Sequence, residues 1–180
     1  MHVAPLTLRL VLVGAALLAG WFDFRFRRIP NWLTISGVLL GFGLNTSFFG
    51  VAGALSAAEG LVLALVIYVP LYILRGMGAG DVKLMAALAA MAGPTNWLVI
   101  FLVTSLLGGV AALALVLARK RFAQTWFNVL TLVGSLARFE APYRTNIELD
   151  VRESQSLRLP HGTVIAFGAA LCLLAGLLPN

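Results

Sequence analysis

The sequence predicts an all-α fold, a polytopic integral membrane bundle of about six transmembrane helices with its amino terminus outside. Hydrophobic residues make up 61% of the 180 residues and charged residues 11%, whereas roughly a quarter of residues are charged in soluble domains. The apolar residues form runs close to the roughly 20 residues that a crossing helix needs. We therefore expect one integral membrane domain, residues 1–180, with a polar cytoplasmic loop around residues 119–160.

Breaks in the hydropathy separate the elements. The expected helices cover residues 6–22, 31–49, 54–74, 81–91, 96–118 and 161–178. Gly93-Pro94 ends the fourth helix, because glycine followed by proline usually stops a helix. That helix is short for a bilayer core of about 30 Å. We interpret it as a short crossing helix that sinks Asp81 below the membrane surface or thins the bilayer locally, rather than as a re-entrant hairpin. Residues 125–139 have the spacing of an amphipathic helix on the inner leaflet.

Basic residues orient the bundle. They cluster after the first and fifth helices, at Arg25, Arg27, Arg28, Arg119, Lys120 and Arg121. With an outside amino terminus and six crossings, every Lys and Arg except Arg9 lies on the cytoplasmic side, as the positive-inside rule requires. The net charge of +6 is therefore read as an orientation signal, and no nucleic-acid partner is expected.

Two acids carry the functional prediction. Asp23 ends the first apolar segment, and Asp81 follows the glycine turn Gly78-Ala79-Gly80. The topology places both acids at the cytoplasmic edge of the bilayer, where an ionisable group indicates function. Two carboxylates that share one proton can activate water, because one accepts a proton while the other donates one. Gly78 and Gly80 are expected to adopt backbone conformations closed to other residues and to leave room for a substrate strand.

Simpler roles compete with this interpretation. Asp81 is also explained as a helix N-cap, and Asp23 as an interfacial acid neutralised by the arginines that follow it. Glu59 falls toward the outer side, where a structural role is expected. Lys83 is expected on a different helix face from Asp81, extending toward lipid headgroups. His161 has no nearby Cys or His partner, so an interfacial position is expected, with no metal and no cofactor.

These residues resemble the motifs of type IV prepilin peptidases, membrane aspartyl proteases with a Gly-x-Gly-Asp signature. The matching segments are Asp23 with Arg27-Arg28-Ile29-Pro30-Asn31-Trp32, then Gly78-Ala79-Gly80-Asp81-Val82-Lys83, and Leu159-Pro160-His161-Gly162 before the last helix. The resemblance implies that Asp23 and Asp81 are the catalytic pair. It further implies that the substrate-binding or motif-shaping residues are Gly78, Gly80, Lys83, Pro30 and Asn31.

The resemblance also implies a substrate and a location. The substrates would be precursors of type IV pilins or prepilin-like proteins, cut after a basic leader at the cytoplasmic face of the bacterial inner membrane. The lipid bilayer and the pilus-assembly machinery would be further partners. Larger members of the family insert a domain with paired cysteines and also methylate the product. Here Cys172 is the single cysteine, so the resemblance gives no support for N-methyltransferase activity. The compact form of the chain resembles the peptidases that serve tight-adherence (Flp-type) pili.

Two other classes stay open at this point. One is an ion-coupled membrane transporter that uses the acids as a proton relay, which repeated halves in the sequence would favour. The other is a non-enzymatic membrane scaffold of secretion or pilus assembly, in which both acids are caps. The separation of Asp23 and Asp81 in space distinguishes the enzyme from the scaffold.

Overall fold

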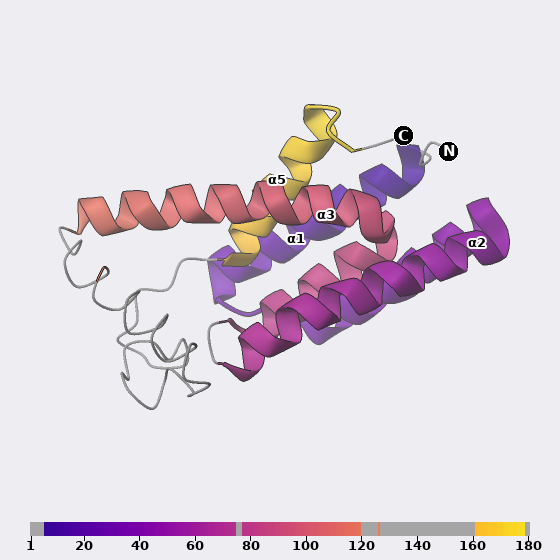
Figure 1. Ribbon diagram of the computed structural model, residues 1–180, viewed down its shortest axis with the longest axis horizontal. Helices are drawn as coiled ribbons and strands as arrows, with labels where there is room; N and C mark the ends of the chain where they lie inside the picture. The colour runs from indigo at the N-terminus through magenta and orange to yellow at the C-terminus, as the bar shows by residue number, and fades with distance from the viewer. Residues whose placement is uncertain (1–5, 75–76, 120–125, 127–160, 179–180) are drawn as a thin grey trace.

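The computed structural model describes residues 6–74, 77–119, 126 and 161–178, and the regular secondary structure in this part of the chain is all helical. Four helices make up this part: α1 (Leu6–Phe26), α2 (Asn31–Ile73), α3 (Ala79–Ala118) and α5 (His161–Leu174). Figure 1 shows the start of α5 beside the end of α1, with α3 running alongside. The all-α class is confirmed for these residues. The expected amphipathic helix at 125–139 and the polar loop lie almost wholly outside them.

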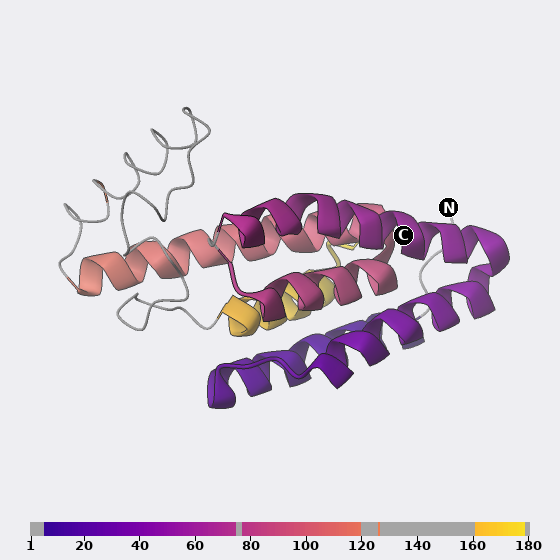
Figure 2. The same ribbon diagram turned by 90° about the horizontal axis from the view of Figure 1, so that it is seen from below.

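Both long helices are broken once by a glycine. Gly50 (φ 60°, ψ −142°) interrupts α2, and Gly93 (φ 71°, ψ 172°) interrupts α3. A positive φ is readily adopted by glycine but strains other residues. At each glycine the chain reverses direction, so the two halves of each helix run back past one another (Figure 2). The break predicted at Gly93-Pro94 is confirmed. The turn expected over residues 50–53 is wrong in length, because Gly50 alone is non-helical there.

The apolar helices fit a membrane protein. Within the described ranges, α1, α2 and α3 are each long and apolar enough to cross a bilayer, and α5 is a shorter apolar helix. Because α2 and α3 double back at their glycines, each half of either helix is a separate apolar helix. This arrangement is compatible with the expected topology. The six crossings and the outside amino terminus stay predictions.

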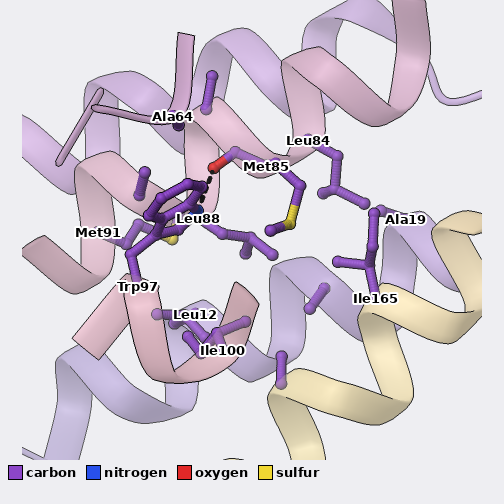
Figure 3. Packing of buried hydrophobic residues seen from close by; sticks show 14 of the residues in the cluster. Leu12, Ala19, Ala64, Leu84, Met85, Leu88, Met91, Trp97, Ile100 and Ile165 are labelled. Atoms are coloured by element: carbon purple, nitrogen blue, oxygen red, sulfur yellow. Dashed lines mark hydrogen bonds between the residues drawn. The ribbon is translucent and has the colours of Figure 1, made fainter. Parts of the chain in front are cut away.

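The first half of α3 forms the centre of the bundle. Every residue from Leu84 to Met91 is buried, and in Figure 2 this segment lies between the two halves of α2. A helix that is apolar on all sides is typically enclosed by protein. Because other helices enclose this short segment, its length does not require the bilayer to become thinner around it. Figure 3 shows its side chains meeting Trp97 and Ile100 of the second half and Ile165 of α5.

Glycines let α2 approach this central segment closely. A Cβ atom added at Gly41 would lie 2.8 Å from the backbone carbon of Ala90, and one added at Gly60 would overlap the carbonyl oxygen of Ala89. Small residues of this kind allow the backbones of membrane helices to pack in direct contact. The two halves of α2 therefore hold α3 from both sides.

Polar side chains secure the broken end of the central segment. The Asn45 Nδ2 group donates to the carbonyl oxygens of Gly41 at 2.8 Å, Ala90 at 3.1 Å and Met91 at 3.1 Å. The helical donor for Ala90 would come from residue 94, which is proline and has no N–H. Asn45 thus satisfies carbonyls that the break leaves open. The Trp97 Nε1 group donates to the Met85 carbonyl at 3.1 Å and joins the two halves of α3 (Figure 3).

Two expected helix ends need correction. The first helix continues to Phe26 instead of ending near residue 22. The Arg27 N–H donates to the Asp23 carbonyl at 2.9 Å, and the positive φ of Arg27 (54°) then turns the chain. Asp23 therefore lies within the last turns of α1 rather than beyond it. The last helix ends at Leu174 instead of Leu178, because Gly176 adopts a positive φ of 62°.

Candidate functional site

Asp23 is held against the beginning of α5. Its side chain is buried, with 9% of the residue exposed, and its Oδ2 atom accepts a long hydrogen bond of 3.4 Å from the Thr163 backbone N–H. The Thr163 hydroxyl donates to the Gly20 carbonyl at 3.2 Å and fixes the start of α5 on α1. A Cβ atom at Gly162 would lie 2.9 Å from the Asp23 Cβ atom and 3.0 Å from Oδ2. Only glycine leaves the space that Asp23 occupies.

Asp81 lies in the first turn of α3, where the N-cap residue is Gly78. Its carboxylate accepts a backbone hydrogen bond from Gly78, and the Val82 N–H donates to the Gly78 carbonyl at 3.3 Å. An acid at the third helical position commonly bonds back to the N-cap backbone in this way. The interpretation of Asp81 as the N-cap itself is therefore wrong. Its side chain is half-buried and faces the start of its own helix.

The glycines of the turn act through space rather than through unusual backbone angles. Gly78 has φ −75° and ψ 145°, which other residues adopt readily, and Gly80 lies inside α3. The expectation of backbone conformations closed to other residues is wrong for both. A Cβ atom at Gly78 would lie 3.2 Å from Asp81 Oδ2, and one at Gly80 would lie 3.4 Å from the Ile29 Cβ atom. These glycines let the carboxylate and the α1–α2 connection approach the start of α3.

The fold brings the two acids together. The carboxylates of Asp23 on α1 and Asp81 on α3 interact electrostatically, although they are distant along the sequence. Two carboxyl groups brought near each other can share one proton, so that one accepts a proton while the other donates one. A pair of carboxyl groups in unequal protonation states can act as a general acid and a general base. The catalytic role of these residues stays a prediction.

Two further side chains flank the acids. Tyr68 lies within electrostatic range of Asp81, and His161 lies within electrostatic range of Asp23. Tyr68 is buried in α2, with 2% exposed, and its ring meets Trp97 and Phe101 edge-on at centroid distances of 6.1 and 5.9 Å. Four helices thus contribute one ionisable side chain each to this part of the bundle.

Sequence reasoning missed Tyr68 and gave His161 no part in the site. Tyr68 stands in an apolar run, and its hydroxyl is the one signal of a polar role. The interfacial position of His161 stays a prediction; the residue is half-buried, and its Cε1 atom would lie 3.7 Å from a Cβ atom at Gly108 of α3. His161 stands directly before the motif residue Gly162 in the sequence, but its approach to Asp23 depends on how α5 packs against α1.

Lys83 and Asn31 join the starts of α3 and α2. The Lys83 Nζ group donates to the Asn31 Oδ1 atom at 2.9 Å on the exposed surface, so it binds another predicted site residue. Pro30 is the N-cap of α2, with φ −64° and ψ 139°. Ile29, just before it, packs against Gly80. The two sequence segments singled out by their motifs are therefore neighbours in space.

The remaining candidates lie apart from the acids. Glu59 is exposed on α2, one residue before the Gly60 contact with the far end of the central segment. Cys172 is buried in α5 with a free thiol. In the portion of the chain that can be described, no group of three or more His, Cys, Asp or Glu residues is placed to hold a metal ion.

Comparisons with known proteins identify relatives. A family model described as the type IV leader peptidase family matches residues 10–113, which is more than half of the chain and includes both acids. The chain is 33% identical over 118 residues to the prepilin leader peptidase/N-methyltransferase of Neisseria gonorrhoeae. The matched region is 62% of this chain and 41% of that relative. No solved structure matches.

Proposed function

Because the chain belongs to the type IV leader peptidase family, we propose that it is a membrane aspartyl endopeptidase that removes the leader peptide from type IV prepilins or prepilin-like proteins. The observation that carries this proposal is that the fold brings Asp23 and Asp81 within electrostatic range of each other. A scaffold whose acids served only as separate caps would not need them at one site. The proposal covers peptidase activity alone, since the chain spans 41% of the relative that also carries a methyltransferase name.

The proposed mechanism uses a water molecule between the two carboxyl groups. The ionised carboxylate accepts a proton from the water while the water oxygen attacks the scissile carbonyl carbon. The protonated carboxyl group donates its proton to the carbonyl oxygen, which gives a tetrahedral intermediate. The carboxyl group that took the proton from water then donates it to the amide nitrogen as the C–N bond breaks. The leader leaves with a new carboxyl group and the pilin with a new amino group. Asp23 and Asp81 together carry both roles.

The surroundings of Asp23 agree with a site at the edge of the bilayer. Large aromatic side chains near it are exposed, at Trp21, Phe24, Phe26 and Trp32. Aromatic residues are enriched where membrane meets water. Arg25, Arg27 and Arg28 are exposed beside them, as expected for the cytoplasmic side. We place the reaction at the cytoplasmic face, where a leader in front of a hydrophobic helix would emerge.

Co-expression with a candidate prepilin tests the proposal. Asp23→Asn and Asp81→Asn each remove one carboxyl group with little change in volume, and each should abolish leader removal. Glu59→Gln is the matched control, since it makes the same chemical change at an exposed position away from the pair. Leader removal is read from the size and the amino-terminal mass of the pilin. Normal processing by either membrane-inserted Asp variant would refute the mechanism.

A further inference from the structure

His161 begins α5 at the point where this helix meets Asp23. The next two residues both touch the acid: Gly162 lacks the space for a Cβ atom beside it, and the Thr163 N–H donates to its Oδ2 atom. The imidazole itself is half-buried, interacts electrostatically with Asp23, and lies against Gly108 on its other side. The ring therefore lies against α3, within electrostatic range of Asp23 on α1.

We propose that His161 is a positioning residue of the aspartyl pair, whose imidazole acts on the Asp23 carboxylate. This inference rests on the proposed function and deepens it. Histidine is the side chain whose charge ordinarily changes between about pH 5 and 8. A protonated imidazole beside a carboxylate favours the ionised form of that carboxylate. The reaction needs one such carboxylate in the pair.

The neighbouring charges identify Asp23 as the group to which His161 responds. The described part of α5 has no other charged side chain, and α3 presents Gly108 to the ring. Asp81 acts on Asp23 from the start of α3, and the arginines that end α1 are exposed. A positive charge at a helix N-terminus is disfavoured by the helix dipole. The protonated form of His161 therefore depends on Asp23 for its stability.

The sign of the effect follows from this pairing. As pH falls, His161 gains a proton, and its positive charge opposes the loss of charge from Asp23. Leader removal should then persist to a lower pH than it would with an uncharged residue. His161→Phe keeps a ring against Gly108, and His161→Gln keeps a polar side chain, but neither variant titrates. Both should move the acid limb of kcat/KM to higher pH, because neither variant supplies the positive charge.

The activity test compares the purified protein with both variants across pH on one prepilin. Glu59→Gln, which removes an exposed charge away from the pair, should leave the profile unchanged. A wild-type profile in both His161 variants would overturn the proposal. If the wild-type protein cleaves no prepilin at any pH, the proposed function fails instead, so the two failures are distinguishable.

A second measurement needs no substrate. The chain has two histidines, so nitrogen-15 spectra of the imidazoles can be assigned by comparison with His161→Gln. Coupling between two sites is reciprocal. Asp23→Asn should therefore lower the pH at which His161 titrates, whereas Glu59→Gln should not change it. Identical titration of His161 in the wild-type protein and Asp23→Asn would refute the proposal, whatever the activity results.

Discussion

Gly162→Ala is the sharpest test of how α5 positions Asp23. The added Cβ atom would lie 2.9 Å from the Asp23 Cβ atom, whereas ordinary contacts of this kind are 3.4–4 Å. The two groups must separate by roughly 0.5–1 Å, and a displacement of about 1 Å can reduce a rate by about 100-fold. We expect kcat for leader removal to fall by about 10- to 100-fold. The backbone of Gly162 is not in the positive-φ region, so lack of space is the cause.

The assay is single-turnover cleavage of a purified prepilin, with thermal unfolding measured on the same samples. Gly109→Ala and Gly14→Ala are matched controls, because nothing lies within 4 Å of a Cβ atom at either position. Both should keep wild-type rates, and alanine is the better helix former by about 1 kcal/mol. A folded Gly162→Ala protein that cleaves at the wild-type rate would refute the assignment of Asp23 to the reacting site.

Three other substitutions probe the supports of the site. Tyr68→Phe keeps the aromatic packing but removes the hydroxyl within electrostatic range of Asp81, and should lower kcat a few-fold with unchanged thermal stability. Asn45→Ala leaves buried carbonyls at the end of the central segment without their donor, and should lower the free energy of unfolding by about 1–3 kcal/mol. Lys83→Met removes an exposed hydrogen bond to Asn31, and should change stability by less than about 1 kcal/mol while lowering kcat a few-fold.

Each of these substitutions has its own comparison. Tyr72→Phe makes the same change one turn later in α2 and should leave kcat unchanged; equal losses in the two Tyr variants would argue against a specific role for Tyr68. Ser47→Ala removes an exposed bond to Gly43, so it should destabilise less than Asn45→Ala. Asn31→Ala combined with Lys83→Met should cost no more than either change alone, because both remove one bond. Additive losses would contradict the proposed link.

Local patterns predicted much of this protein correctly. The runs of apolar residues identify the helices, and Gly93-Pro94 ends the central segment where expected, because a proline N–H is missing and glycine tolerates positive φ. Asp23 and Asp81 stand out because carboxylates are rare in such runs. Predictions that depended on atomic detail were less secure. Asp81 is not the N-cap, and the turn glycines act through space, because both features depend on which atoms crowd the start of α3.

What the sequence alone determined is the kind of protein: an all-helical, apolar, basic chain with two acids beside motifs of one peptidase family. These properties are local, since hydropathy, helix breaks and motif spacing are all read over short stretches of chain. Only the tertiary structure decided that Asp23 and Asp81 interact, that the start of α5 encloses Asp23, and that His161 and Tyr68 flank the two acids. Those contacts join different helices, and their geometry depends on how each helix is rotated and docked, which the packing of the whole bundle determines.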